Sequence, residues 1–552
     1  MACCMLVSFG AAAQQKRVID TNDKITIQIV NAEAFVGIKR DTLEQTKLIG
    51  NVQMKQGDNF MSCDSAYINL VANNVEAFGN VHIVQPGGTQ VQSDYLRYIG
   101  NTKVAYLKGN VKLDDGKNTL WSEDITYNLG TKIAQYDNGG TLQSEGTTVT
   151  SNKGMYNVNT KDARVTGDVI VTDPQYNVTS QDLGYNTASK VVRFFSRSVV
   201  VHDGKSTLTT TGGSYATKEG IAHFTNRTAL QDKEQYIEGD KIDYNRNSGY
   251  GNATGNVIAI DTAKHTTLYS GYASYNEKRR TLLATIKPVL RQENGKDSIF
   301  IRADTFFSAP VGMLNVKAKG KNTVADSSAA KSVKRGRNRN ATDSSAADGA
   351  IQKVAETPVD TTAPRYYTGY HHVLIFSDSL QGRCDSIAYS FRDSVMRMMI
   401  EPVAWSRMSQ ITGDTILLYT DSSTIKKAFV PANALIVSQS GPDQAQLYDQ
   451  VQGKTLTANF HNNTITDMIV WPAAQSIYYP KDDSGAYLGV NQSESERMRI
   501  LFRQEKIHRI LLEQEPKQTM TPLDKADLPS MRLSRFKWLE EKRPKSKEEL
   551  FK

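Results

Sequence analysis

The chain has 552 residues, of which 39% are hydrophobic and 22% are charged, and its formal net charge is +8. The mean hydropathy is −0.46, and beyond the amino terminus no run of about 18 apolar residues occurs, which excludes a bundle of membrane-spanning helices. The length alone suggests three or four domains, but an internal repeat favours one or two long modules.

The amino terminus, MACCMLVSFGAAAQQ, combines an apolar run with small residues at Ala11 to Ala13. This combination is typical of the later part of a secretory signal, although a basic segment before it is missing. We therefore predict that residues 1–15 are the remnant of a signal peptide and that the protein is exported into the cell envelope.

A phrase of about thirty residues repeats along the chain. Each copy has a polar residue, usually Asp, a run ending in Tyr, a turn, and a second run often entered through Gly-Asn-Val. The anchors of the phrase are Glu33, Asp64, Asp94, Asp124, Lys153, Asp182, Gly213, Asp240, Gly271, Asp304, Asp385, Asp414 and a blurred copy near Lys454. A repeat of this length indicates a stacked array, which works through a long continuous surface.

Each repeat predicts β-strands, because Val, Ile, Thr and Tyr are abundant and apolar residues alternate with polar ones. One face of each second strand is therefore apolar and the other is wet. Glycines on the apolar parity, such as Gly79, either bend the sheet or leave room for an apolar ligand. The candidate ligand-facing residues of this face are Leu48, Val52, Met54, Val81, Ile83, Leu107, Val111, Leu113, Val169 and Val257.

The other recurring residues have structural interpretations. Cys63 and Cys384 occupy the same place in distant repeats, so we predict no disulfide between them. The repeated Asp is expected to form hydrogen bonds in the turn before a strand. The recurrent tyrosines are expected to form a ladder; they are Tyr67, Tyr98, Tyr127, Tyr156, Tyr185, Tyr215, Tyr244 and Tyr275.

Catalytic motifs are missing from the sequence. It has no HExxH, no phosphate-binding loop, no GxSxG and no dinucleotide-binding glycine fingerprint. His371 and His372 are adjacent, so on a strand they would point to opposite faces and make a poor metal pair. The pattern predicts a protein without catalytic activity, cofactor or metal.

Two segments depart from the repeat. Residues 313–365 have low complexity and predict a disordered insertion, whose basic run is either a solvated loop or a contact for nucleic acid or anionic lipid. A second set of repeats is expected over residues 366–480. Residues 491–552 predict a charged helical tail, because Met498, Ile500, Leu501 and Ile507 have amphipathic spacing. We expect this tail to cap the open end of the stack, with docking on a partner as the alternative.

The segments GNVQM, GNVHI, GNVKL, GDVIV and GNVIA, each preceded by a strand such as DSAYI or DYLRY, resemble the OstA/LptA-like domain of lipopolysaccharide transport proteins. The resemblance covers about residues 25–310 well and 366–475 more loosely. It implies an all-β, elongated, open β-jellyroll over residues 25–312, with an apolar interior that shields lipid A acyl chains.

This resemblance implies a non-enzymatic periplasmic carrier or bridge that takes lipopolysaccharide to the outer membrane and is peripheral to membranes. Its partners would be lipopolysaccharide and other Lpt-type bridge or translocon proteins, joined head to tail through sheet edges, and not nucleic acid. The sequence lacks a long carboxy-terminal barrel, which counts against the translocon itself. Three alternatives remain open: an assembly scaffold that binds outer-membrane proteins through its sheet edges, an extracellular polysaccharide-binding solenoid, and, more weakly, an outer-membrane barrel.

Overall fold

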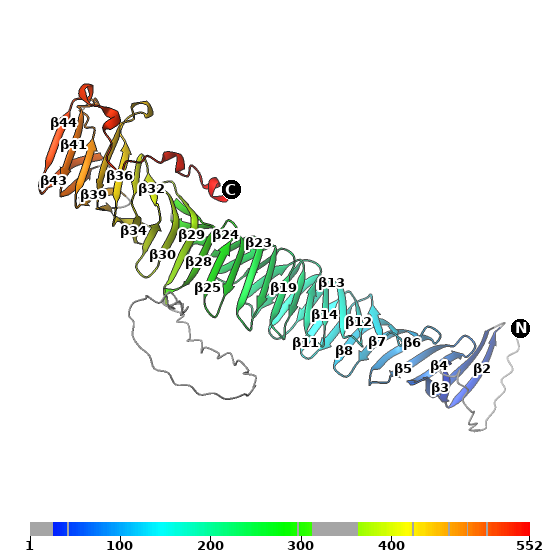
Figure 1. Cartoon of the computed structure of the whole chain (residues 1–552). Helices are drawn as coiled ribbons and strands as arrows, with labels where there is room; N and C mark the ends of the chain where they lie inside the picture. The colour runs from blue at the N-terminus through cyan, green and yellow to red at the C-terminus, as the bar shows by residue number, and fades with distance from the viewer. Residues whose placement is uncertain are drawn as a thin grey trace, which may run out of the picture. The chain divides into compact units, whose positions relative to one another are not determined.

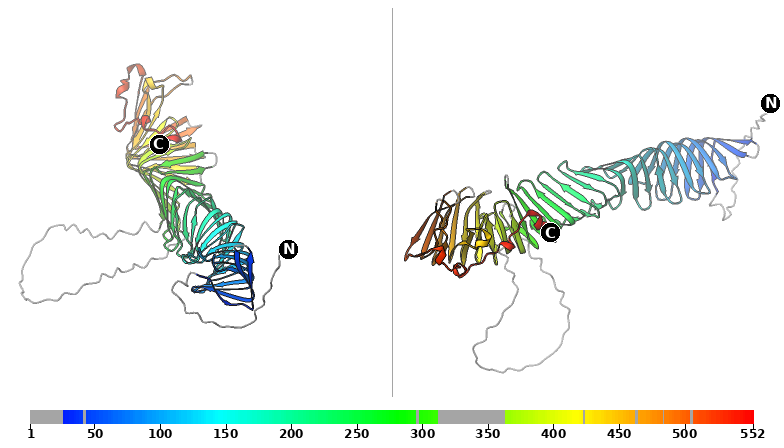
Figure 2. Two further views of the ribbon diagram at one scale, coloured as in Figure 1. Left: turned by 90° about the vertical axis from the view of Figure 1, so that its right-hand side faces the viewer. Right: turned by 90° about the horizontal axis from the view of Figure 1, so that it is seen from above.

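The computed structural model describes residues 26–40, 43–294, 297–311, 363–421, 424–461, 464–482, 484–503 and 506–552. These residues form antiparallel strands and a few short 3-10 segments, so the all-β prediction is confirmed. The chain divides into two compact units, unit 1 (Met1–Asn247) and unit 2 (Ser248–Lys552). Figure 1 shows the strands of each unit stacked side by side, and Figure 2 shows them from two further directions.

The strands of unit 1 are β1 (Gln28–Asn31), β2 (Ala34–Arg40), β3 (Leu43–Gln56), β4 (Asn59–Asn69), β5 (Asn74–Val84), β6 (Gln90–Ile99), β7 (Val104–Asp114), β8 (Asn118–Asn128), β9 (Ile133–Tyr136), β10 (Gly140–Ser144), β11 (Thr147–Ser151), β12 (Lys153–Asn157), β13 (Asp162–Thr172), β14 (Tyr176–Asn186), β15 (Val191–Phe194), β16 (Ser198–His202), β17 (Ser206–Thr210), β18 (Gly213–Ala216), β19 (Ile221–Phe224), β20 (Thr228–Gln231), β21 (Gln235–Gly239) and β22 (Lys241–Asn245).

The strands of unit 2 are β23 (Tyr250–Asp261), β24 (Thr266–Asn276), β25 (Thr281–Thr285), β26 (Val289–Asn294), β27 (Asp297–Arg302), β28 (Thr305–Pro310), β29 (Arg365–Phe376), β30 (Gln381–Ser390), β31 (Val395–Met399), β32 (Val403–Ser406), β33 (Ser409–Thr412), β34 (Thr415–Asp421), β35 (Thr424–Val430), β36 (Ala434–Gln439), β37 (Tyr448–Gly453), β38 (Thr455–His461), β39 (Thr464–Trp471), β40 (Ala474–Tyr478), β41 (Val490–Ser495), β42 (Arg497–Arg503), β43 (Lys506–Glu513) and β44 (Lys517–Thr521).

The long strands of unit 1 each pass through two walls. In β5 the register shifts between Phe78 and Val81, so the first half pairs in one wall and the second half pairs in the other. Where the bend is complete, the halves are separate strands. Strand β9 pairs with the second half of β8 in one wall, which we name wall 1, and β10 pairs with the first half of β8 in the other, wall 2. We name the bend the corner, and the opposite edge, where the hairpin turns of the two walls approach each other, the mouth.

Alternate residues of each wall point into the space between the walls. In β7 the burial alternates along both halves of the strand, with Leu107 and Val111 fully buried. Tyr106, on the outer face of the same strand, is 40% exposed. The predicted division into an apolar face and a wet face is confirmed, because a period of two places successive side chains on opposite faces.

The repeated Asp and the Gly-Asn dipeptide meet at the corner. Gly79 and Asn80 have φ angles of +73° and +44°, and Asn80 Nδ2 donates a hydrogen bond of 2.9 Å to Asp64 Oδ2. The same bond, 2.8 Å long, joins Asn110 to Asp94. The expectation that Asp acts in the turn before a strand is therefore wrong, since Asp64 lies inside β4 and bonds to the corner of the next strand.

In another repeat the same hydrogen bond at the corner forms with the positions of the amide and the carboxylate exchanged. Asn152 Nδ2 donates a 3.0 Å hydrogen bond to Asp168, so here the amide holds the anchor place and the carboxylate follows the glycine. In this repeat the anchor is thus Asn152 and not Lys153. In unit 2, His372 lies at the bulge of β29 with a φ of +53° and contacts Asp304 at 2.7 Å. A polar pair across the corner is therefore what the repeat preserves.

Replacing Gly79 with Ala is expected to lower the free energy of unfolding by about 1–3 kcal/mol. A Cβ at this position would lie 2.3 Å from Asp64 Oδ2, and the φ of +73° is itself strained for alanine. Gly87 is the matched control: its φ is +89°, but a Cβ added there would meet nothing within 4 Å, so its Ala variant loses only about 1 kcal/mol. Urea unfolding of both variants measures the difference, and equal losses would contradict the corner clash.

Residues 312–362 divide the strands of unit 2 in sequence but not in the sheet. Strand β28 pairs with β29 from Thr305↔Tyr370 to Pro310↔Arg365, so the strands on either side of this segment are neighbours. Most of the predicted insertion 313–365, with its basic residues, and the predicted signal remnant 1–15 lie outside the described residues. The basic residues are Lys331, Lys334, Arg335, Arg337 and Arg339.

The prediction of a helical tail over residues 491–552 is wrong. Strands β41 to β44 occupy residues 490–521, so the strand array runs beyond the predicted limit at residue 480. Met498 and Ile500 are both buried and lie two residues apart, as on one face of a strand. Strand β42 pairs with the edge of β39, whose backbone N–H and C=O groups would have stayed unpaired if this segment were a helix. Only 3-10 segments follow β44. No helix among the described ranges is long and apolar enough to span a membrane.

Residues 523–552 lie along the outer face of one wall of unit 2, which corrects the prediction of an end cap (Figure 1, red trace ending at C). We name them the C-terminal strap. Strap residues Leu533, Phe536 and Trp538 pack on a wall that includes β36 and β37. Leu550 is fully buried near the end of the chain.

Candidate functional site

The space between the two walls is the candidate site. All ten candidate residues lie on inner faces, nine in unit 1 and Val257 in unit 2, and each is at most 1% exposed. Their inward direction is as the alternation predicts, whereas their contact with a ligand stays a prediction. For the glycines on the apolar parity, the structure supports the predicted bend: Gly50, Gly79, Gly109, Gly167 and Gly255 all have positive φ angles of the kind that a bend requires.

One row of inner residues runs through wall 2 of unit 1 without a polar interruption. Strand registers align its members as Met54, Met61, Ile83, Val91, Leu113, Leu120, Leu142, Val149, Val171, Val178, Val200, Leu208, Leu230 and Ile237. We name these residues the apolar row. With neighbouring strands about 4.8 Å apart, the row extends about 60 Å along unit 1.

Tyrosines from wall 1 close the mouth against polar residues of wall 2. Tyr98 Oη donates a short hydrogen bond to Gln56 Oε1, and Tyr127 Oη donates one of 2.5 Å to Gln85 Oε1. Each pair joins residues 42 positions apart, at the mouth ends of the two walls. Tyr156 Oη donates a third such hydrogen bond, to Asp115 Oδ2. We name these three contacts the mouth latches.

The latch tyrosines are almost completely shielded from solvent. Burial raises the pKa of the Tyr98 phenol to about 12 and raises the pKa of Tyr127 further. Both therefore remain neutral hydrogen-bond donors at any physiological pH. The strand registers align the predicted tyrosine ladder from Tyr98 to Tyr244. Tyr67 instead lies on the outer face beside Phe78, and Tyr275 is 39% exposed.

The third latch contains a buried carboxylate. Tyr156 Oη donates a 2.5 Å hydrogen bond to Asp115 Oδ2, and Lys161 Nζ forms a 2.7 Å ion pair with the same oxygen. Burial raises the pKa of Asp115, but the hydrogen bonds from Lys161, Tyr156 and Asn118 outweigh burial and hold that pKa at about 2. The ionised carboxylate is therefore the form that the fold stabilises.

The stability of unit 1 is expected to fall as the pH is lowered from about 4 to about 2. Because the folded pKa of Asp115 lies below its unfolded value, its contribution is complete above the unfolded value and is lost as the pH falls through the folded one. The shift corresponds to about 2 kcal/mol. Urea unfolding across this pH range measures it. An Asp115→Asn variant should lose this part of the pH dependence, and an unchanged slope would contradict the assignment.

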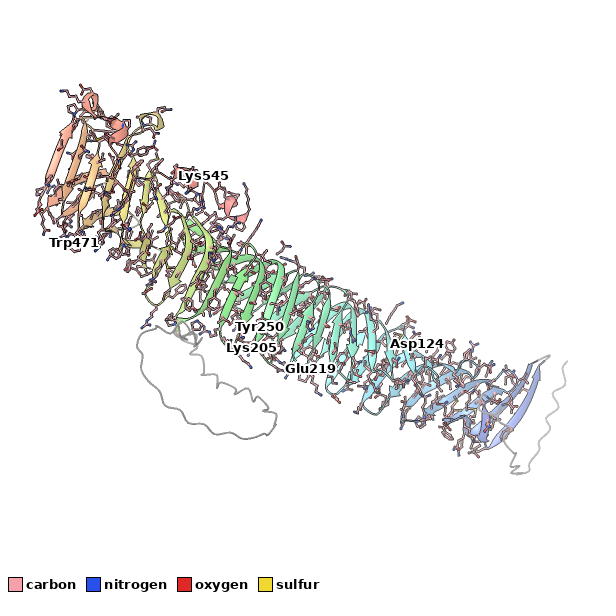
Figure 3. The ribbon with its side chains drawn as sticks, viewed as in Figure 1. Asp124, Lys205, Glu219, Tyr250, Trp471 and Lys545 are labelled. Carbon is pink, nitrogen blue, oxygen red and sulfur yellow. The ribbon has the colours of Figure 1, made fainter. Side chains whose placement is uncertain are left out.

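The interior becomes accessible in the carboxyl-terminal part of unit 1. The last four members of the apolar row, Val200, Leu208, Leu230 and Ile237, are half-buried, and Tyr215 on the opposite wall is half-buried too. Lys205 and Glu219, in mouth turns of the two walls, project from this part of the molecule (Figure 3). Sequence reasoning missed these four residues because their strands lack the Gly-Asn-Val signal, although their apolar alternation was available.

In the described part of the chain, no group of three His, Cys, Asp or Glu residues could hold a metal ion. Cys63 and Cys384 are free and buried. Burial raises the pKa of their thiols to about 11 and about 12, which makes both poor nucleophiles.

A crevice of about 20 Å³, room for about one water molecule, lies beside Met54, Ile83 and Tyr98. Pockets that hold small ligands have about 300–1,000 Å³. This crevice is therefore too small for a multi-chain lipid in the present arrangement of the walls.

Two kinds of comparison find proteins similar to this chain. The OstA-like protein family matches residues 23–181 and 159–240, whereas a search of curated proteins finds no match. Among solved structures, the chain is similar to LptH of Pseudomonas aeruginosa, described as the LptA-homologous periplasmic component of the lipopolysaccharide transport device, with 13% identity and a TM-score of 0.21 over 26% of this chain and 95% of LptH. The WD40 domain of SCAP from fission yeast aligns with 7% identity and a TM-score of 0.11 over 82% of this chain and 95% of that domain. Residues 23–240 of the chain are therefore similar to the OstA-like protein family.

Proposed function

We propose that the protein is a non-enzymatic periplasmic carrier or bridge that binds lipopolysaccharide through its acyl chains and serves its transport to the outer membrane. The apolar row carries this proposal, because it offers an uninterrupted apolar path between the two walls of unit 1. Similarity to the OstA-like family supports the class of ligand. The fold would then act as an elongated β-jellyroll that is peripheral to membranes.

The physics of burial suits such a task. Each methylene group removed from water contributes about 0.8 kcal/mol, and a row of aliphatic side chains supplies this without a specific pocket. Since successive members of the apolar row are chemically alike, a chain that slides along the row changes its free energy little. Directional transport would draw on partner proteins of the Lpt type, which would join the sheet edges head to tail.

The test is the lipid content of protein purified from its native envelope. Mass spectrometry of the extract should find lipopolysaccharide in amounts comparable to the protein. A photoreactive residue at Leu208 should crosslink that lipid, whereas one at the outward-facing neighbour Thr209 should not. Protein that folds normally yet retains and captures no lipopolysaccharide would overturn the proposal.

A second function, an assembly scaffold that binds outer-membrane proteins through its sheet edges without carrying lipid, is favoured by the amino-terminal strands. In β1 and β2, Val30 and Phe35 are more than half exposed, as expected for a surface that another chain covers. Depletion of the protein separates the two functions. Normal lipopolysaccharide export together with loss of an outer-membrane protein complex would favour the scaffold.

A further inference from the structure

We propose that acyl chains enter unit 1 through residues 191–245, the open stretch, and that the mouth latches keep residues 43–186, the latched stretch, shut to lipid until the walls part. This inference rests on the proposed function and assigns to it a place of entrance and a gate. It follows from three observations on unit 1.

The first observation is a change of exposure along the apolar row. Its ten members in the latched stretch, from Met54 to Val178, are all buried, most of them completely. Its four members in the open stretch, from Val200 to Ile237, are half-buried although they have the same chemistry and stay in register. The type of side chain therefore does not explain the change.

The second observation is the behaviour of the tyrosines at the mouth. One inner row of wall 1 aligns Tyr185, Val192, Tyr215, Ala222 and Tyr244 through the strand registers. Tyr185 is 1% exposed, and the latch tyrosines Tyr127 and Tyr156 are 0% and 1% exposed. Tyr215 and Tyr244 are half-buried. Val192 and Ala222 of the same row stay buried, so the tyrosine rings are what become more exposed, at the same strands at which the apolar row becomes accessible.

The third observation is what the latches would lose on opening. Tyr98 and Tyr127 donate to Gln56 and Gln85, which are themselves buried. Gln85 also reaches the carbonyl of Leu129 at 3.5 Å, and Gln56 reaches that of Gly100 at 3.2 Å. Separating the walls breaks such bonds together, since they all join the same two edges.

A gate of this kind lowers the lipid affinity of the latched stretch to its intrinsic value multiplied by the fraction of time that the walls are apart. The open stretch carries no such reduction, because an alkyl chain has only to displace water from residues that are already accessible. Lipid should therefore occupy the open stretch first. Loosening the latches should then extend occupancy towards β3.

Photocrosslinking with purified lipopolysaccharide tests this order. In the wild-type background, a photoreactive residue at Leu208 or Leu230 should capture lipid at least tenfold more than one at Leu113 or Val81. In the triple variant Tyr98→Phe, Tyr127→Phe, Tyr156→Phe, which removes the three donors and keeps the rings, capture at Leu113 should rise at least tenfold. Lys112, the outward-facing neighbour of Leu113 in β7, is the control and should stay silent.

Amide hydrogen exchange supplies a second measurement that needs no new residue in the interior. Lipopolysaccharide should slow exchange in residues 191–245 of the wild-type protein, and in residues 43–186 only in the triple variant. Equal capture at Leu113 and Leu208 in the wild-type background would overturn the gate and leave the proposed function standing. A triple variant that is less stable but binds lipid at the same positions would show that the latches are merely structural. Absence of lipid from every inner position would overturn the proposed function itself.

Discussion

Deleting residues 527–552 is expected to destabilise unit 2 by more than about 5 kcal/mol and to lower its unfolding midpoint by at least about 10 °C, because most of the C-terminal strap covers an apolar outer face. Phe536 and Trp538 pack on Tyr448, with ring centroids 5.4 and 5.3 Å apart. Without the strap, Leu435 and Val437 would face water. The variant should therefore also bind a hydrophobic dye.

The strap is held by buried glutamines as well as by apolar contacts. Gln450 Nε2 donates to the carbonyl of Met531 at 3.0 Å, and its Oε1 accepts from the backbone N–H of Leu533 at 2.8 Å. Gln410 bonds to Lys537 and Leu539 in the same way, at 2.8 Å each. Each side-chain amide thus pairs with an extended backbone as a neighbouring strand would.

Differential scanning calorimetry of the deletion variant measures the effect, with unit 1 expected to unfold as in the full chain. Gln410→Ala should reproduce part of the loss, about 1–3 kcal/mol, since it leaves strap backbone groups unpaired. Gln492, which is exposed on β41, is the matched control and its Ala variant should change little. A deletion that leaves the midpoint of unit 2 unchanged would mean that the strap contributes nothing to the fold.

Replacing Leu107 with Ala is expected to lower the free energy of unfolding of unit 1 by about 2–5 kcal/mol. Leu107 is 1% exposed between the walls. The closely packed walls cannot collapse fully into the cavity that the substitution leaves. Its neighbour Tyr106 lies on the outer face of the same strand and is 40% exposed, so Tyr106→Ala should cost less than about 1 kcal/mol. Denaturant unfolding of the pair measures which face is the core, and the reverse order would contradict the assignment of the faces.

Much of unit 1 could be predicted because its interactions are local in the repeat. Alternation along one strand suffices to assign Leu107 inward and Tyr106 outward, since successive side chains of any strand point to opposite faces. The role of Asp64 could not be predicted in this way, because its partner Asn80 belongs to the next strand. In the repeat with Asn152 and Asp168, the amide and the carboxylate have exchanged positions, and this exchange is visible in the sequence. It indicates a contact only once the two positions are known to lie side by side.

The tail shows why pattern alone failed at the carboxyl terminus. Met498, Ile500, Ile507 and Ile510 fit a helical period when read as one segment, but they belong to two strands, β42 and β43, that pair with each other. An isolated segment with that spacing would favour a helix, whereas the unpaired edge of β39 favours a strand. The latter interaction is available only after the preceding strands have formed.

A thirty-residue repeat and a period of two are properties of the chain alone, and they are enough to establish a β array with one apolar face. How that face is used depends on the folded arrangement. Folding brings Gln56 and Tyr98 together across the mouth, closes the walls over the predicted residues, leaves Leu208 and Leu230 accessible, and lays the C-terminal strap along an outer wall. The physical reason is that each of these features depends on contacts between segments distant in sequence, whose approach no local pattern records.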